Sequence, residues 1–422
     1  MLEENNKFPF ANLAYSWYFF TKILYEESVN SNLEDLLFIS REGFALKKLF
    51  DFYQLIKNPN VKIKTHYLKV SRRSTFMISL KPLKDEDFEI LFRQYRKISI
   101  NSFLKSLNLD DFTEDLAKEL KVTKKEFKKI SLDLPSDPIF LRLINLKSFR
   151  KLYEKRRDEQ STLFQKYLKL LLGTTDIPKR INLVDVGWKG TIQDNIFNWT
   201  KQITTERITV HGYYLGLLKG GTIDKNNCKK GLLFSNVDRV SRGLNIYCDN
   251  LSLFELFLHA NHASVKSYKQ GENVFQMIEY DDYSEKDLIE NKILPISDKI
   301  FTYFKTITIF LENSNKSVQF LEYFVIKKHF SMIFYPSEIE IESYENLQHK
   351  ENFGAFSDSY LDPKKNYNLW GRLNLTLRLI FYRKVTDISF WHFLYIKRNC
   401  IYGVSGVYRI YRYLQYKFHN YL

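Results

Sequence analysis

Apolar and polar positions near the start of the chain follow the pattern of a strand–helix–strand unit. Residues 33–54 begin with an apolar run, break at Ser-Arg-Glu-Gly, and continue with apolar positions at helical spacing. Residues 63–75 form a second apolar run that ends in polar residues. This order is typical of parallel strands joined by a helix. A dense aromatic pattern at residues 10–28 predicts a further helix before the unit.

The same pattern returns in the middle of the chain. Residues 180–188 have the pattern of a strand, residues 190–199 that of a helix and residues 207–218 that of another strand. The segment 83–172, between the two units, has mostly helical spacing. We therefore expect an α/β fold with a Rossmann-like, mostly parallel sheet, a helical insertion and a helical C-terminal region.

The pattern changes after the predicted sheet. Residues 251–268 and 286–333 carry helical patterns, whereas residues 339–366 are polar with Gly and Pro, as in a loop or linker. The predicted organisation is a first half of the α/β domain (1–82), a helical insertion (83–179), a second half of the α/β domain (180–270), a helical region (271–338), a linker or loop (339–366) and a basic aromatic tail (367–422).

Composition narrows the class of protein. A hydrophobic content of 44% with 27% charged residues is typical of a globular chain. Three scattered cysteines do not suit a disulfide framework and fit a reducing compartment. The chain has no run of about 18 uncharged apolar residues, and its N-terminus lacks the basic region of a signal peptide. We expect a cytoplasmic protein with no membrane-spanning helix.

The net charge of +15 is concentrated in the tail. Residues 364–422 hold 11 Lys and Arg but one acid, Asp387, which favours an anionic partner. A helix over the last 20 or so residues would carry its cations beside one apolar face, formed by Val407, Ile410, Tyr411, Leu414 and Phe418. That face suits either the inner surface of the cytoplasmic membrane or the protein core. Stacking on nucleic acid ranks behind both.

Three polar clusters follow predicted strands, at residues 40–43, 71–73 and 185–191. Each alone could be an ordinary loop, but the carboxyl ends of parallel strands share one edge, where ligands bind. Cations and the amides of a helix N-terminus at this edge suit an anionic substrate. The predicted substrate-binding or phosphate-binding residues are Arg41, Gly43, Arg72, Arg73, Trp188, Lys189, Gly190, Thr191 and Gln193.

Carboxylates are the predicted catalytic groups. Asp185 and Glu42 could act as a base or hold a divalent cation such as Mg²⁺. Glu255 interrupts an apolar helical run, so it would be a general base or the counter-charge of an arginine. His259 and His262 form a weaker metal-binding pair, because two histidines without a third ligand more often belong to a packed helix end.

Known phosphate-binding motifs fit the stretch around Asp185 only in part. The Walker pattern is absent because Lys189 precedes Gly190, and no Gly-x-Gly-x-x-Gly motif follows a strand. Phosphoribosyltransferases have two acids where this chain has one, and haloacid dehalogenase phosphatases need Asp-x-Asp after the first strand. Trp188 would either stack on a sugar or base or pack against a neighbouring loop.

Several blocks nevertheless resemble a family from bacterial capsule and surface-polysaccharide loci, whose members are often labelled haloacid-dehalogenase-like hydrolases or polysaccharide biosynthesis proteins. The blocks lie between about residues 10 and 270 and include "LLFISREGFALKKLFD", "YLKVSRRS" and "LFELFLHANHASVKSY". That family usually has Arg-Asp-Gly in the first block, where Glu42 keeps the charge. The block "LVDVGWKGTIQDNIF" matches through Asp185, Gly187, Trp188, Gly190, Thr191 and Gln193.

The resemblance implies a pathway more than a reaction. Longer relatives carry a phosphatase-like domain in front of this region, to which the hydrolase label would belong. We expect an enzyme of surface-polysaccharide biosynthesis at the membrane's cytoplasmic face, transferring a phosphorylated, nucleotide-activated or lipid-linked sugar. The alternatives are a non-catalytic component that binds glycan or other assembly enzymes, and a phosphoribosyltransferase-like or haloacid-dehalogenase-like enzyme.

Overall fold

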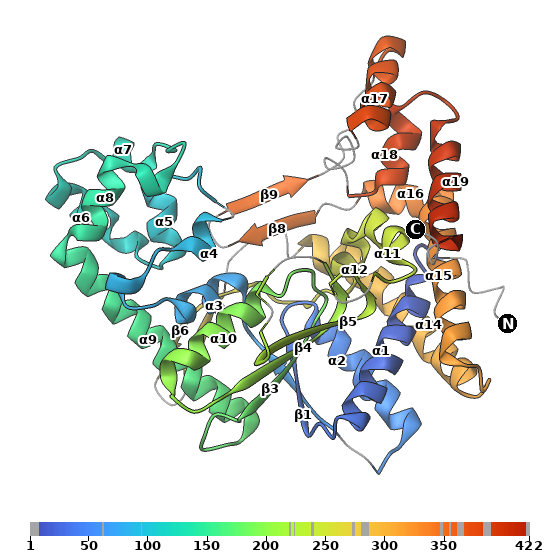
Figure 1. Ribbon diagram of the computed structural model, residues 1–422, viewed down its shortest axis with the longest axis horizontal. Coiled ribbons are helices and arrows are strands. Elements are labelled where there is room, and N and C mark those ends of the chain that lie inside the picture. The colour runs from blue at the N-terminus through green and yellow to red at the C-terminus, as the bar shows by residue number, and fades with distance from the viewer. Residues whose placement is uncertain are drawn as a thin grey trace.

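The central feature of the computed structural model is a five-stranded sheet with all strands parallel, in the order β2-β1-β3-β4-β5 (Figure 1). The strands are β1 (Asp35–Ile39), β2 (Lys64–Leu68), β3 (Arg180–Asp185), β4 (Thr209–Leu217) and β5 (Asn227–Ser235). Helices flank the sheet, which confirms the predicted Rossmann-like α/β fold. The structure describes residues 8–60, 63–93, 95–218, 221–222, 224–237, 240–271, 275–279, 287–346, 349–353, 356–360, 367–382 and 390–418.

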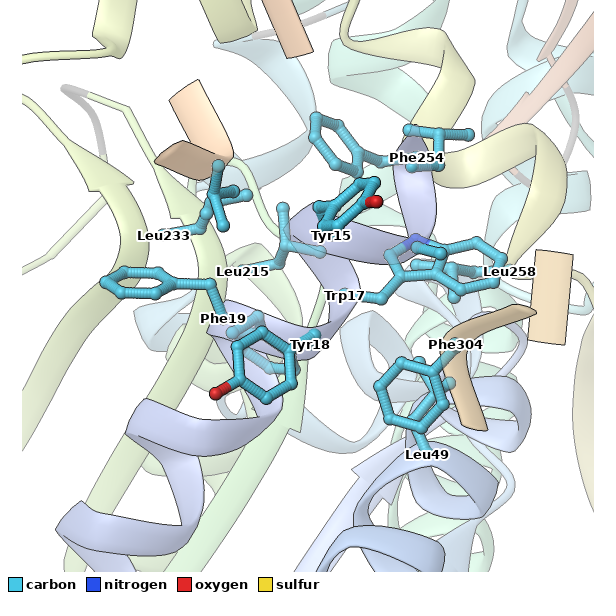
Figure 2. Close-up of a cluster of buried hydrophobic side chains, with 14 of the residues drawn as sticks. Tyr15, Trp17, Tyr18, Phe19, Leu49, Leu215, Leu233, Phe254, Leu258 and Phe304 are labelled. Atoms are coloured by element: carbon cyan, nitrogen blue, oxygen red, sulfur yellow. The ribbon is translucent and has the colours of Figure 1, made fainter. Parts of the chain in front are cut away.

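Alternate residues of the strands enter two different hydrophobic cores. In β1, Leu36 and Phe38 pack with α1 (Leu13–Asn30) and α2 (Gly43–Lys57). Leu37 and Ile39 face the opposite side, toward α9 (Lys147–Leu172) and α10 (Thr191–Ile203). Helix α1 is buried on nearly every side, and its aromatic residues pack between the sheet, α2 and the later helices (Figure 2). Both faces of the sheet are therefore covered, as a parallel sheet requires.

The strand order places a topological switch between β1 and β3. After β1 the chain passes through α2 on one face and returns as β2; after β3 it passes through α10 on the other face and returns as β4. The loops beyond β1 and β3 therefore diverge, and a crevice at their carboxyl ends is where ligands of such sheets bind.

The segment between β2 and β3 is helical and has a core of its own. It begins with α3 (Arg72–Ser79), and the first half of α9 packs on it, whereas the second half of α9 packs on the sheet. We call α4 to α8, with the first half of α9, the insertion; it lies at one end of the molecule (Figure 1). Its other elements are η1 (Leu83–Asp85), α4 (Glu89–Phe92), α5 (Ile100–Ser106), η2 (Asp110–Phe112), α6 (Thr113–Leu120), α7 (Lys124–Lys128), η3 (Leu134–Ser136) and α8 (Pro138–Asn145).

The sequence analysis missed β5, because two lysines interrupt its apolar pattern. The Lys229 side chain is fully buried and its Nζ lies 2.6 Å from Asp194 Oδ1 in α10. Burial lowers the pKa of Lys229, and Asp194 opposes that shift by stabilising the charged form. A lysine is accommodated inside the sheet only because this carboxylate lies opposite it.

The predicted helix over residues 251–268 is wrong in its second half. Helix α12 (Ser252–Phe257) follows α11 (Leu244–Tyr247) and η4 (Cys248–Asn250), and the chain then forms an antiparallel hairpin of β6 (Val265–Gln270) and β7 (Phe275–Glu279). The Gln160 amide of α9 donates to the Tyr268 carbonyl (2.8 Å) and accepts from its N–H (2.9 Å). The Gln160 side chain thus forms with the Tyr268 backbone the two hydrogen bonds that a neighbouring strand would otherwise form.

The C-terminal part is helical, with one further hairpin. Residues 339–366, predicted as a loop, include most of α16 and the β8–β9 hairpin. No helix among the described residues is long and apolar enough to span a membrane, as expected. The elements are η5 (Ile289–Ile293), α14 (Leu294–Glu312), α15 (Val318–Phe334), α16 (Glu338–Glu345), β8 (His349–Phe353), β9 (Phe356–Tyr360), α17 (Leu369–Tyr382), α18 (His392–Asn399) and α19 (Val404–Lys417).

Two Gly→Ala substitutions should change stability in opposite directions. A Cβ at Gly212 in β4 would lie 1.8 Å from Gln193 Oε1, so Gly212→Ala should lower the free energy of unfolding by about 2–3 kcal/mol through overpacking. Gly406 in α19 has open space around its Cβ position, so Gly406→Ala should raise it by about 0.5–1 kcal/mol. Urea unfolding measures both; equal effects would contradict the packing around Gly212.

Candidate functional site

The predicted site lies where β1, β2 and β3 end. Ser40 fixes the first two loops to each other: its Oγ donates to the Val70 carbonyl (2.6 Å) and accepts from the Val70 N–H (3.0 Å). Glu42 follows as the residue before α2, and Arg72 is the first residue of α3. The loops that carry these two charged residues are therefore held side by side by backbone contacts.

Three carboxylates from distant parts of the sequence interact at this edge. Asp185, the last residue of β3, experiences the charges of both Glu42 and Glu255. Glu42 likewise experiences Glu255, which lies in α12. The structure thus brings together all three residues that the sequence analysis selected as catalytic.

The pKa of Asp185 is strongly raised. Its side chain is buried, and Oδ1 accepts a hydrogen bond from the Val186 N–H (2.8 Å). Burial is the largest cause and repulsion from Glu42 the second, and together they raise its pKa from 3.8 to about 8. The hydrogen bond from Val186 and the charge of Arg72 act in the opposite direction and lower the pKa. Asp185 therefore carries a proton at neutral pH, as a general acid must.

Glu42 is less enclosed but is also perturbed. Burial raises the pKa of its carboxyl group, Arg41 lowers it, and Glu255 raises it further. The Arg41 N–H donates to Glu42 Oε2 (3.1 Å). Gly43 next to it has a packing role: a Cβ there would lie 2.7 Å from the Phe38 carbonyl carbon. The glycine lets α2 start directly against β1.

The adjacent residues Arg72 and Arg73 have different surroundings. Arg72 is half-buried and its charge acts on Asp185. Arg73 is buried and donates to the Lys105 carbonyl and to Asn108 Oδ1 of the insertion. Arg72 is thus on the site side of α3, whereas the hydrogen bonds of Arg73 hold α3 against the insertion and do not support its predicted role in phosphate binding.

The loop between β3 and α10 is shaped by the buried Asp194–Lys229 pair beneath it. Gly190 has φ 73°, and a Cβ there would lie 2.8 Å from both Lys229 Cε and the Tyr214 hydroxyl oxygen. Lys229 Nζ also donates to the Lys189 carbonyl (3.3 Å), whereas the Lys189 side chain is exposed. Gly190 is therefore needed for the turn, and the Lys189 ammonium is free to reach solvent.

Gln193 and Trp188, which belong to the same block, make contacts within the fold. Gln193 is buried; its Nε2 donates to Asn227 Oδ1 and the Cys228 carbonyl (2.8 Å each), and its Oε1 accepts from the Tyr214 hydroxyl (2.7 Å). The Trp188 ring stacks on Phe234 at 5.6 Å between centroids. These contacts favour the packing interpretation of Trp188 and give Gln193 a structural role. Thr191 is half-buried at the start of α10.

The two histidines are not arranged as a metal site. His262 Nδ1 lies 2.8 Å from the Ala263 carbonyl, which can only accept, so Nδ1 carries the proton. His262 Nε2 then accepts from the Tyr67 hydroxyl at 2.6 Å. His259 is buried. Within the described ranges, no three His, Cys, Asp or Glu side chains are grouped to hold a metal ion.

Tyr67 is a member of the site that the sequence analysis did not select. Burial and then the charge of Glu42 raise the pKa of its hydroxyl group, so it remains a hydrogen-bond donor at neutral pH. It is the fourth of the five residues of β2, one position before the strand end. Its position near the end of a strand next to β1 is the signal in the sequence that marks it, because such a residue lies close to the polar residues that follow the strands.

Neither the comparison with protein-family models nor that with curated proteins finds a match to this chain. The fold and site define the class: a Rossmann-like α/β protein with a cluster of three carboxylates at the switch point of its sheet. Arg41 and Arg72 provide positive charge beside two of these carboxylates.

Asp185 should make stability fall as pH rises. Its pKa in the folded protein, about 8, exceeds the ordinary value of 3.8. The stability that the protonated Asp185 side chain contributes is therefore fully present below about pH 4 and is lost as the pH rises to about 8. Wild type should lose up to about 1.4 kcal/mol of unfolding free energy per pH unit from this group. Asp185→Asn, which mimics the protonated acid, should lack this slope.

Urea unfolding at a series of pH values measures the difference between wild type and Asp185→Asn. Asp298→Asn is the matched control, because Asp298 is exposed on α14. It should follow the wild-type profile. Identical profiles for wild type and Asp185→Asn would show that Asp185 does not hold a proton in the folded protein.

Proposed function

We propose that this protein is an enzyme that transfers a sugar from a phosphorylated, nucleotide-activated or lipid-linked donor, using the switch-point crevice as its active site. The observation that carries the proposal is the meeting of Asp185, Glu42 and Glu255 beside Arg72, with the Asp185 pKa raised to about 8. Perturbed acids that gather at the ligand-binding edge of a sheet are typical of catalytic sites more than of structural ones.

The charges of the site suit departure of a phosphate. Arg72 and Arg41 would stabilise the negative charge that develops on the leaving phosphate oxygen. Asp185, protonated at neutral pH, would donate a proton to that oxygen, and Glu42, beside Arg41, would accept a proton from the attacking hydroxyl group. Tyr67, whose hydroxyl proton is donated to His262 Nε2, would accept a hydrogen bond from the substrate next to Glu42.

A magnesium ion would fit this site when brought by the substrate. Mg²⁺ is commonly held by one or two carboxylates with phosphate oxygens and water as its other ligands, so Glu42 and a deprotonated Asp185 would suffice, and with the ion bound Asp185 would no longer be the proton donor. The repulsion that raises the pKa values of both groups is what a cation would relieve. The ion would neutralise phosphate charge.

The biological setting proposed is surface-polysaccharide biosynthesis, such as capsule assembly, at the cytoplasmic face of the membrane. Its support is the resemblance of the blocks around Glu42 and Asp185, which lie far apart in the sequence and contribute to one site. The second candidate is a non-catalytic component that binds glycan or other assembly enzymes. The packing roles of Gln193, Gly190 and Trp188 favour it, because they show that much of the Asp185 block maintains the fold.

Binding and turnover of nucleotide sugars and sugar phosphates would test the proposal. Arg72→Ala should weaken donor binding about tenfold or more, because a charged hydrogen bond is lost. Asp185→Asn should keep binding within a few fold and lower turnover by about 10²–10⁴, the usual worth of a general acid. Calorimetry measures the first effect, and release of the nucleotide or phosphate measures the second.

Arg150→Ala is the matched control for Arg72→Ala, since Arg150 is exposed on α9, and it should behave as wild type. Donor binding without turnover in wild type would favour the non-catalytic component. Phosphate release without an added acceptor would indicate hydrolysis instead of transfer. Full turnover by Asp185→Asn would remove Asp185 from the mechanism.

A further inference from the structure

Helix α17 exposes an entire apolar face. Its exposed apolar residues are Leu369, Trp370, Leu377, Ile380 and Phe381, which recur at helical spacing along one side. Polar residues along the edge of this face attach the helix to the protein: Arg372 Nη1 donates to the Cys400 carbonyl (3.3 Å), and the Thr376 hydroxyl accepts from the Ile401 N–H (3.1 Å). The helix is therefore held in place by polar contacts while its apolar residues face solvent.

Helix α19 has the same arrangement. Its buried side is fixed to the α/β part of the molecule, where the Tyr408 hydroxyl donates to the fully buried Asp249 (2.5 Å). Tyr416 is buried on that side as well. The apolar face predicted from the sequence is exposed: Val407, Ile410, Tyr411, Leu414 and Phe418 are each at least 44% accessible. Docking of α19 on the protein therefore leaves this face uncovered.

The two faces belong to one region of the molecule. Helices α17, α18 and α19 lie together at the end opposite the insertion (Figure 1). The turn between α18 and α19, which holds α17 through Cys400 and Ile401, also carries the fully exposed Tyr402. We call α17, this turn and α19 the C-terminal surface.

The charge of this region indicates which kind of partner would bind it. Residues 367–382 and 390–418 contain seven Lys and Arg and no Asp or Glu. Arg398 pairs with Glu345, and Arg412 lies 3.8 Å from Asp249. Arg378 and Lys417 are exposed, and Arg409 lies over the Tyr335 ring. Exposed apolar and aromatic residues flanked by cations are what an anionic lipid surface binds.

We propose that the C-terminal surface binds anionic membranes, with the apolar faces of α17 and α19 entering the headgroup region and the flanking cations contacting lipid phosphates. This inference is independent of the reaction at the sheet edge. An uncharged partner face would satisfy the apolar residues but would leave the cations without counter-charges.

Trp370 provides a direct probe. It is 77% exposed, whereas Trp17, Trp199 and Trp391 are buried and Trp188 is half-buried against Phe234. With vesicles of phosphatidylcholine and about 30% phosphatidylglycerol, the full chain should cosediment and its tryptophan emission should shift to the blue. Binding to pure phosphatidylcholine should be about tenfold weaker or more, and high salt should weaken binding to the anionic vesicles. Trp370→Phe should keep binding and lose most of the emission shift.

Aspartate substitutions test the faces themselves. Trp370→Asp and Ile410→Asp should each weaken binding to anionic vesicles about tenfold. Leu132→Asp, at a site 79% exposed in the insertion, is the matched control and should bind as wild type. Circular dichroism and calorimetry would check that each variant is folded.

Three results would overturn the proposal. One is equal binding of neutral and anionic vesicles, or no binding to either. The second is anionic binding unchanged in both aspartate variants. The third is a wild-type dimer without vesicles that Trp370→Asp or Ile410→Asp converts to a monomer, because the C-terminal surface would then be an interface between two copies of this chain.

Discussion

The structure depends on the parallel pairing of β1 with β3, two strands that are about 140 residues apart in the sequence. Because α2 and α10 leave these strands toward opposite faces, the loops that follow them cannot pack against each other. Such an edge is where ligands of parallel sheets bind, and Glu42 and Asp185 follow the two strands to it. The site is a result of how the sheet is wound, and the sequence adds only the charges.

Polar contacts on one helix connect the sheet to the rest of the molecule. Three consecutive residues of α10 are buried; the first two have partners in β5 and the third has its partner in α3. Gln193 bonds to the Asn227 side chain and the Cys228 carbonyl in β5, Asp194 pairs with Lys229 there and accepts from Thr222 N–H, and Asn195 donates to the Thr75 hydroxyl in α3 (3.1 Å). Such contacts contribute modest net stability but are costly to break, so they fix the position of α10 more sharply than apolar packing alone.

The sequence was sufficient to predict four of the five strands and the insertion, because their apolar patterns are local. The strand β5 could not be predicted, since Lys229 reads as a surface residue until Asp194, in a different element, is known to face it. The hairpin strand β6 depends in the same way on Gln160, more than 100 residues away. Strand β4, by contrast, contains no Lys, Arg, Asp or Glu, so its apolar and aromatic residues can be recognised as a strand without knowledge of a partner.

The candidate site could likewise be predicted only in part, because some of its side chains are positioned by residues that are far away in the sequence. That Glu42 and Asp185 share one edge of the sheet follows from the ends of β1 and β3, whereas the sequence marks Glu255 only as one charge in an apolar helix and does not place it at this edge. Which of two adjacent arginines faces the crevice depends on the rotation of α3, and this is set by Asn108 and the Lys105 carbonyl in the insertion. Gln193 could not be assigned for the same reason, because its partners lie on β5.

The neighbouring positions of Arg72 and Arg73 have a mechanical consequence. Arg73 is hydrogen-bonded to the insertion, whereas the charge of Arg72, one residue earlier on the same short helix, lowers the pKa of Asp185. The first turn of helix α3 therefore joins the two halves of the molecule, because one of its arginines bonds to the insertion and the other acts on Asp185. A substitution in the insertion that displaced this turn would also change the charge that Asp185 experiences, although the insertion contributes no residue to the carboxylate cluster.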